Sequence, residues 1–328
     1  MHRIVIIDAG GTISASPDSS GALGGGAGGE ELLALLPQAE RQRCVVERAG
    51  IGLSEEMRLT DARRLVAMVQ AACARPDTLG VVVAHGTDTM EEVAFLCDLL
   101  HGGDMPVVFT GAQRAPSVAG FDGAANLRDA VQTILHPGSI GAGVLIVFGG
   151  RIISARHATK VDSSAPDAFG PEWAVVGRVD PGRARLFSRP LRTPPLACAT
   201  LDENVELVMI GLGSSGRGVA LASAAPTRGI VLRALGQGNV PPAVVEAMAQ
   251  ARAEGVIILV ATGAGAGGTG AAYASGAKLR DLGAVFAGDL GARQARILLA
   301  CVLGDGASPL EAQASLLAWL AGSDPCRD

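Results

Sequence analysis

The stretch VVVAHGTDTME runs four apolar residues into a histidine, a glycine and then Thr87, Asp88 and Thr89. Gly80–Ala84 is predicted to be a strand, and Thr89 with Glu92 three residues later has the spacing of a capping box for the following helix. Thr87 and Asp88 then stand at the strand tip, where a hydroxyl beside a carboxylate can take part in nucleophilic or proton-transfer chemistry. A capped helix with polar turn residues is the alternative interpretation.

A second candidate group follows the first predicted strand, Arg3–Ile7. Gly10, Gly11 and Thr12 in DAGGTIS come directly after this strand. In open parallel sheets the ligand crevice lies beyond the carboxyl ends of the strands, so these residues are placed where a site is expected. A dinucleotide site would need G-x-G-x-x-G entering a helix, and AGGTIS lacks that spacing.

A third candidate is Lys160, in the segment GRIISARHATKVDSS. We expect it in a polar turn after an apolar strand, with Arg156 and His157 shortly before it. A solvated surface lysine is one interpretation. The other is a base, because a lysine beside a threonine and a carboxylate can take the hydroxyl proton when its surroundings favour the neutral amine.

The elements that must position these residues alternate along the first half of the chain. Strand-like runs such as RIVIID, LGVVVAHG and MPVVFTG are separated by helix-period segments such as DARRLVAMVQAACA and GAANLRDAVQTIL. This alternation indicates crossover units and a parallel sheet. We therefore predict an α/β fold in which residues 1–188 form a larger N-terminal domain with a doubly wound, mainly parallel sheet.

The periodicity lapses in FSRPLRTPPLACAT, which predicts a linker over residues 189–204. Strand and helix alternate again from NVELVMIGLG onward, so residues 205–328 are predicted to form a smaller C-terminal α/β domain. The glycine-rich run SGALGGGAGG is expected to be a mobile loop after the first strand.

Composition excludes several classes of function. The net charge is −5, and no basic run suited to a phosphate backbone occurs, so no nucleic-acid partner is expected. The six cysteines show neither C-x-x-C nor a Cys/His cluster at metal-ligand spacing, which predicts reduced thiols and no metal site. No apolar run is long enough for a signal peptide core or a membrane span, so a cytoplasmic protein without a membrane partner is expected.

Seven segments together resemble one known family. IIDAGGTIS, GLSEEM, GVVVAHGTDTMEEVAFLCDLL, PVVFTGAQR, DGAANLRDA, RHATKVDS and GQGN occur in the order and at about the spacing found in the bacterial-type L-asparaginases. The similarity covers nearly the whole chain, and the HGTDT segment with its following helix is highly specific. It implies hydrolysis of L-asparagine to L-aspartate and ammonia, with no metal or organic cofactor.

The resemblance assigns roles residue by residue. Thr12 is implied to be the nucleophile, while Thr87, Asp88 and Lys160 form a second catalytic cluster. Substrate-binding roles are implied for a set spread over both domains: Gly11, Ser54, Glu55, Ala112 and Gln237. Backbone N–H groups near Ala112 are expected to stabilise the oxyanion, at roughly 3 kcal/mol per donor. The family also implies a homodimer or a dimer of dimers, with the C-terminal domain contributing to the interface.

The chain departs from the family pattern at several positions. Members usually have a tyrosine in the loop after the first threonine, whereas the only tyrosine here is Tyr273, in GAGAGGTGAAYASG. We hypothesise that Tyr273 enters the site across the dimer interface, and an ordinary loop tyrosine is the alternative. Glu55 and Gln237 replace a common glutamine and a common asparagine. Asp8 places a carboxylate at the end of a buried strand with no partner evident from the sequence.

Three functions therefore remain open from the sequence. The first is an amidohydrolase acting on L-asparagine, with weaker glutaminase activity. The second is an amidase acting on another small amide, such as D-asparagine, glutamine or a peptide-linked amide. The third is a catalytically impaired amino-acid-binding homologue that keeps Ser54, Glu55 and Asp88. An ammonia-release assay separates the first from the third, and a substrate panel separates the first from the second.

Overall fold

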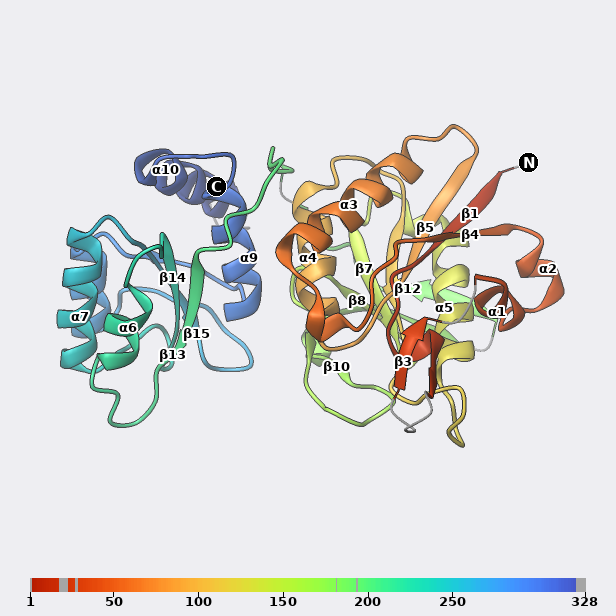
Figure 1. Cartoon of the computed structure of the whole chain (residues 1–328), viewed down its shortest axis with the longest axis horizontal. Helices are drawn as coiled ribbons and strands as arrows, with labels where there is room; N and C mark the ends of the chain where they lie inside the picture. Colours follow the sequence, from red (N-terminus) through yellow and green to blue (C-terminus); the bar gives the residue numbers. More distant parts are fainter. Residues whose placement is uncertain (1, 18–22, 27–28, 181, 193, 323–328) are drawn as a thin grey trace. The chain divides into compact units, whose positions relative to one another are not determined.

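The structure is a computed structural model that describes residues 2–17, 23–26, 29–180, 182–192 and 194–322. The chain divides into two compact units, Met1–Pro195 and Leu196–Asp328. Each unit has its own sheet and core (Figure 1). The division falls inside the segment 189–204 that the sequence analysis predicts to be a linker.

The first unit is built on an eight-stranded sheet with strand order β12-β11-β8-β7-β6-β5-β1-β4. Five neighbouring strands run parallel: β4 (Cys44–Arg48), β1 (Arg3–Asp8), β5 (Thr78–Ala84), β6 (Val107–Thr110) and β7 (Val144–Phe148). The other three continue the sheet antiparallel: β8 (Arg151–Ser154), β11 (Val175–Asp180) and β12 (Arg183–Leu186). The predicted mainly parallel sheet is confirmed, and the antiparallel edge is an addition that the sequence reading lacked.

Helices cover both faces of this sheet (Figure 1). The helix α5 (Gly123–Leu135) packs on β5, β6 and β7, and α1 (Gly29–Ala34) packs on β4, while the short α2 (Gln38–Arg41) precedes β4. The core on the α5 face joins strand residues such as Ile6 and Val82 to Leu127 and Val131 of the helix. On the other face, α3 (Leu59–Cys73) contacts β5 and α4 (Met90–Leu100) contacts β7. Because strand side chains alternate between faces, the fully buried strands need apolar residues at nearly every position.

The order of the strands decides where a site can form. From β1 the chain passes outward to β4 and then crosses back to β5 on the opposite side of β1. The topological switch point therefore lies between β1 and β5, and ligands of open α/β sheets bind beyond the carboxyl ends of the strands at such a point. The tips of β1 and β5 lead directly into the segments that contain Thr12 and Thr87.

Two short hairpins complete the first unit. After the 3₁₀ turn η1 (Thr12–Ser14), β2 (Ala15–Pro17) pairs antiparallel with β3 (Leu23–Gly26). The predicted mobile loop falls partly on residues 18–22 and 27–28, which lie outside the described residues. The other hairpin joins β9 (Thr159–Lys160) and β10 (Phe169–Gly170). Lys160 thus lies in a short strand paired with Phe169, and the prediction of a polar turn at this position was wrong.

The second unit has a parallel sheet of four strands in sequence order: β13 (Val205–Met209), β14 (Gly229–Ala234), β15 (Ile257–Thr262) and β16 (Val285–Phe286). One face packs on α6 (Arg217–Ala222), α7 (Pro242–Ala253) and α8 (Ala274–Asp281), which share a core with the strands. On the other face α9 (Ala292–Val302) contacts β13, β14 and β15, and α10 (Pro309–Gly322) packs on α9. The predicted smaller C-terminal α/β domain is confirmed.

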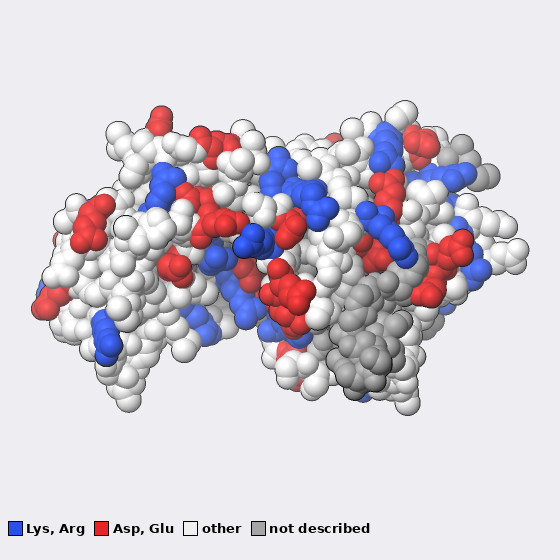
Figure 2. All heavy atoms as spheres, viewed as in Figure 1, with Lys and Arg blue, Asp and Glu red and all other residues white. Residues whose placement is uncertain are grey.

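Charged side chains of both signs are interspersed over the face seen in Figure 2. Within the described parts of the chain, no helix is both long enough and apolar enough to cross a membrane. The structure describes five cysteines, and no disulfide joins any two of them: Cys44, Cys73, Cys97, Cys198 and Cys301.

Candidate active site

Glycines allow the loops at the strand tips to pack against one another. A β-carbon on Gly11 would lie 2.3 Å from the α-carbon of Gly86, and one on Gly86 would lie 2.5 Å from the hydroxyl oxygen of Ser54. A β-carbon on Gly111 would lie 2.4 Å from the backbone oxygen of His85. The segment after β5 therefore contacts the loops that follow β1, β4 and β6, and three predicted site segments meet around Gly86.

Lys160, in β9, contacts the segment after β5 that contains Thr87 and Asp88. Its Nζ donates to Thr87 Oγ1 at 2.8 Å and to Asp88 Oδ1 at 2.7 Å. Thr87 is 6% exposed, whereas the side chain of Asp88 is 59% exposed and that of Lys160 is 15% exposed. A half-exposed ion pair of this kind contributes little to stability, roughly 0–1 kcal/mol. The arrangement is better suited to polarising the Thr87 hydroxyl than to holding the fold together.

The backbone of Lys160 is held by a buried carboxylate. Its N–H donates to Oε2 of Glu91, which lies in the first turn of α4 and is fully buried. Glu91 follows Asp88 by three residues, so the short segment where the loop enters α4 binds both the side chain and the main chain of Lys160. Glu91 has no signal in the sequence that marks it as part of a site, because an acidic residue in the first helical turn is ordinary for helix stability.

Thr89 has a different role from the one predicted. It is the residue before α4, as expected, but its side chain makes no capping bond to the helix within the described structure. Instead its hydroxyl donates to the backbone oxygen of Ser54 at 2.9 Å. The predicted capping box is therefore wrong, because the loop after β4 brings a carbonyl within reach of this hydroxyl. Ser54 and Glu55 lie in the 3₁₀ turn η2 (Ser54–Glu56), with Ser54 buried and Glu55 exposed.

The loop after β6 adds a residue that the sequence analysis missed. Oγ1 of Thr87 donates to Oε1 of Gln113 at 3.1 Å. Ala112, the predicted oxyanion-hole position, precedes Gln113 and is fully buried. The backbone N–H of Gln113 donates to both carboxylate oxygens of Asp122, at 3.2 and 3.0 Å, so the loop is fixed in place. The available signal was the segment TGAQR, whose glutamine has no periodicity or spacing that marks it out.

His85 is fully buried, and burial lowers its pKa to about 4. The ring is therefore neutral at neutral pH, and its Nδ1 lies 2.7 Å from the backbone oxygen of Gly86. Because a carbonyl oxygen only accepts, Nδ1 is the protonated nitrogen and donates to Gly86. His85 thus shapes the turn before Thr87 and is not placed as a base for it.

The tip of β1 is shaped by Asp8. Its Oδ1 accepts from the backbone N–H of Gly10 at 3.0 Å, and the residue is 6% exposed. This contact answers the question that the sequence left open, since Asp8 has at least one partner in its own turn. Gly10 and Gly11 have φ of 82° and 86°, a left-handed conformation that favours glycine. The turn leads to Thr12, which is half-buried at the start of η1.

Gln237 and Tyr273 lie in neighbouring loops of the second unit. The backbone oxygen of Gln237 accepts from Gly270 N–H at 2.9 Å, and Ser275 Oγ donates to Asn239 Oδ1 at 3.0 Å. Both residues are exposed, Tyr273 at 61%. These hydrogen bonds join the loops that contain Gln237 and Tyr273, and the roles predicted for both residues stay predictions.

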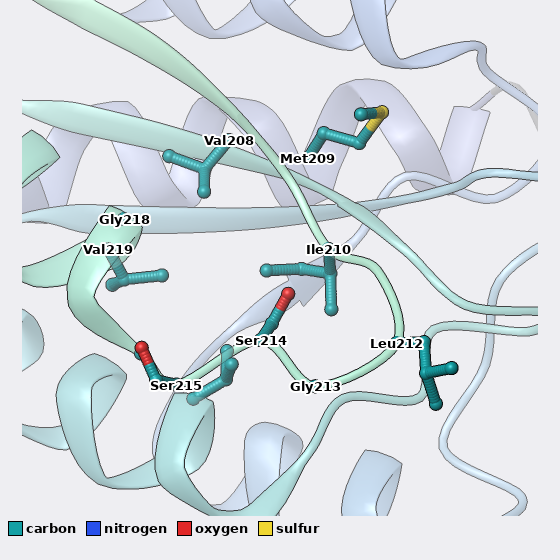
Figure 3. A pocket seen from close by; sticks show the side chains of 11 residues that line it. Val208, Met209, Ile210, Leu212, Gly213, Ser214, Ser215, Gly218 and Val219 are labelled. Carbon is teal, nitrogen blue, oxygen red and sulfur yellow. The ribbon is translucent and has the colours of Figure 1, made fainter.

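An open pocket of about 300 Å³ lies at the end of β13 (Figure 3). It is lined by the loop between β13 and α6, including Leu212, Ser214 and Ser215, together with Val219 and Val244. It contains none of the predicted site residues. Its Ser214 hydroxyl accepts from Gly211 N–H at 2.9 Å and so closes the loop on itself.

The described residues contain no group of three or more histidine, cysteine or acidic side chains that could hold a metal ion. The polar groups gathered at Thr87 are one ammonium, one carboxylate, one hydroxyl and one amide. These groups suit proton transfer and hydrogen bonding to a polar substrate.

Comparisons with known proteins identify the family. Residues 3–192 match the asparaginase N-terminal model, and residues 204–316 match the glutaminase/asparaginase C-terminal domain. A probable L-asparaginase of Deinococcus radiodurans is 36% identical over 94% of this chain and 95% of its own length. An L-asparaginase of Bacillus licheniformis is 32% identical over 92% and 95%.

The crystal structure of a probable cytoplasmic L-asparaginase from Campylobacter jejuni superimposes with a TM-score of 0.84 at 27% identity, covering 97% of this chain and 99% of that one. The fold, the order of its motifs and these matches agree along nearly the whole sequence. The chain belongs to the bacterial-type asparaginase family of amidohydrolases.

Proposed function

We propose that this protein hydrolyses L-asparagine to L-aspartate and ammonia, with Thr12 as the nucleophile. The observation that supports this most directly is the contact of Lys160 with both Thr87 and Asp88, assembled from segments more than 70 residues apart beside the Thr12 turn. The names of the relatives agree with this substrate.

The reaction has two steps. The Thr12 oxygen attacks the side-chain amide carbon, the carbon–nitrogen bond breaks, and ammonia leaves with the proton that Thr12 has lost. Water then hydrolyses the threonine ester and restores the Thr12 hydroxyl as L-aspartate departs. Lys160, Asp88 and Thr87 polarise the reacting groups and move the protons, while N–H donors near Gly11 and Ala112 stabilise the oxyanion. No metal or organic cofactor enters either step.

Substrate recognition rests on charge. The exposed carboxylates of Glu55 and Asp88 attract the α-ammonium of a zwitterionic amino acid, and the Ser54 segment binds its α-carboxylate. Gln237 and Tyr273 complete the site from the second unit of a neighbouring subunit in a homodimer or dimer of dimers. Light scattering on the purified protein measures the oligomeric state, and a monomer would contradict this part of the proposal. We place the protein in the cytoplasm.

The test is ammonia release by the purified protein from L-asparagine, D-asparagine, L-glutamine and a peptide-linked asparagine. The expected result is that L-asparagine has the highest kcat/KM and that Thr12→Ala abolishes release from it. If another amide gave a higher kcat/KM than L-asparagine, that amide would replace L-asparagine as the proposed substrate. Binding of L-aspartate without ammonia release from any of the four would favour the amino-acid-binding homologue.

A further inference from the structure

The hydroxyl of Thr87 has partners on two sides. Lys160 Nζ lies 2.8 Å from Oγ1, and Gln113 Oε1 lies 3.1 Å from it. A lysine ammonium only donates hydrogen bonds, so the Thr87 oxygen must accept from Lys160. The single hydroxyl proton is then directed to the Gln113 oxygen. The chain of hydrogen bonds therefore has one direction, from Lys160 through Thr87 to Gln113.

The position of Gln113 is set by its own backbone. Its N–H is bound by both carboxylate oxygens of Asp122, and the next N–H, that of Arg114, donates to Asp122 Oδ1 at 2.9 Å. Asn126 holds the start of the same loop through a 3.0 Å bond from Nδ2 to the backbone oxygen of Gly111. The Gln113 amide thus meets Thr87 from a loop fixed at both ends.

The nitrogen of the Gln113 side-chain amide, Nε2, is in an unusual position. It is buried and has no hydrogen-bond partner within the described residues. Burying an amide N–H without an acceptor costs free energy. Rotating the amide would let Nε2 donate to the Thr87 oxygen, but the Thr87 proton would then lose its acceptor and Nε2 would compete with Lys160. An acceptor atom of a bound ligand at Nε2 would stabilise the observed orientation.

We propose that Gln113 is a positioning residue that acts through Thr87, by accepting the hydrogen bond of its hydroxyl and so turning an oxygen lone pair toward Lys160. The inference rests on the proposed function, in which Thr87 and Lys160 move protons during amide hydrolysis. Without the Gln113 acceptor the hydroxyl rotates freely about its carbon–oxygen bond, and the aligned arrangement is less populated when the reaction begins.

Steady-state kinetics on two variants provide the first test. Gln113→Met keeps the length of the side chain but removes the acceptor, and kcat is expected to fall about tenfold with little change in KM. Gln113→Glu keeps the acceptor, so it retains most of kcat while its added charge shifts the pH profile. The matched control is Gln132→Met on α5, where Gln132 bonds only to Glu40 among the described residues, and its kcat is expected to stay at the wild-type value. Full activity in Gln113→Met, or equal losses in both Gln113 variants, would overturn the inference.

The second test does not depend on turnover. Only two of the 27 basic residues are lysines, Lys160 and Lys278, so lysine-selective NMR labelling gives two signals, which Lys278→Arg assigns. Gln113→Met is expected to change the chemical shift of the Lys160 signal, because the Thr87 hydroxyl that contacts its Nζ loses the acceptor that fixes its orientation.

In a Thr87→Val background, Gln113→Met is expected to leave the Lys160 signal unchanged, because the linking hydroxyl is absent. An equal shift with and without that hydroxyl would show that Gln113 does not act through Thr87, and the inference would fail. If wild-type protein released no ammonia, the proposed function would fail on the kinetics, and the NMR result would still decide the role of Gln113.

Discussion

The hydroxyl of Thr89 donates a hydrogen bond to the backbone carbonyl of Ser54, with 2.9 Å between the two oxygens. These residues come from different loops, 35 positions apart in the sequence. The bond ties the proposed substrate-binding turn at Ser54 to the segment that contains Thr87 and Asp88. Thr89 thus occupies the N-cap position of α4 without a side-chain capping bond, and its hydroxyl links two segments of the proposed site.

This link predicts a selective effect on substrate binding. Thr89→Val removes the hydroxyl while keeping the side-chain shape, and it is expected to raise KM for L-asparagine about fivefold with a smaller change in kcat, since one neutral hydrogen bond contributes about 1 kcal/mol. Thr89→Ser keeps the donor and is expected to retain the wild-type KM. A loss confined to kcat in Thr89→Val would contradict the role at Ser54.

The proposed proton transfers depend on lysine chemistry at position 160. Lys160→Arg keeps the positive charge, but a guanidinium does not give up its proton in proteins and its planar shape does not reproduce the bond to Thr87. We expect kcat to fall by 10²–10⁴-fold, on the order of a lost general acid–base group. Lys278→Arg is the matched control, because Lys278 is exposed on α8 in the second unit. Comparable activity in both variants would exclude proton transfer at Lys160.

The packing of strand tips predicts which glycine the site requires. Gly11→Ala places a β-carbon 2.3 Å from the α-carbon of Gly86 and imposes a left-handed φ of 86° on alanine. Both effects push the Thr12 turn away from Thr87, so activity is expected to be lost. Gly211→Ala, in the second unit, has no atom within 4 Å of the added carbon and is expected to be active. Ammonia release and circular dichroism on both proteins separate loss of the site from loss of the fold.

The buried carboxylate of Glu91 predicts a coupled effect on stability and rate. Glu91→Leu leaves the Lys160 N–H without its acceptor, which is expected to reduce the free energy of unfolding by about 1–3 kcal/mol and to lower kcat as β9 shifts. Glu91→Gln keeps an acceptor oxygen and is expected to lie between Glu91→Leu and wild type on both measures. Urea unfolding and kinetics test this order, and an unchanged rate in Glu91→Leu would contradict it.

Burial shifts the pKa values of His85 and Asp129 in opposite directions, so the two residues change the free energy of unfolding in opposite ways between pH 4 and pH 6. Burial lowers the pKa of His85 from 6.5 to about 4, so the unfolded chain binds a proton that the folded chain does not, and stability rises with pH in this window. Burial raises the pKa of Asp129 from 3.8 to about 6, so the folded chain keeps a proton that the unfolded chain loses, and stability falls with pH. Asp129→Asn removes the second effect only.

The free energy of unfolding of Asp129→Asn is therefore expected to rise more steeply with pH over this range than that of wild type. The difference in slope is at most about 1.4 kcal/mol per pH unit, the value for one proton. Urea unfolding at several pH values measures it. Parallel curves for the two proteins would show that Asp129 does not hold its proton in the folded state.

Much of the fold was predictable because the signals are local. Strands such as Thr78–Ala84 and helices such as Leu59–Cys73 show in their apolar runs and periodicity, and the start of the helix at Met90 was placed correctly. The antiparallel edge formed by β8, β11 and β12 was not predicted, since strand direction depends on pairing between distant segments. The short strand at Lys160 was missed for the same reason: its partner, Phe169, lies beyond a polar stretch with no periodicity.

The sequence alone determined where the buried strands end and which polar residues follow them, because side-chain alternation, glycine positions and turn residues act within a few positions of one another. Only the tertiary structure decided how those residues connect. Thr89 bonds to Ser54, Lys160 to Glu91 and Thr87 to Gln113 across separations of 35, 69 and 26 residues. The strand order β6-β5-β1-β4 brings the loops after β4, β5 and β6 to one edge of the sheet, and the β9–β10 pair holds Lys160 against the segment after β5. Hydrogen bonds across such sequence separations leave no pattern in a single sequence.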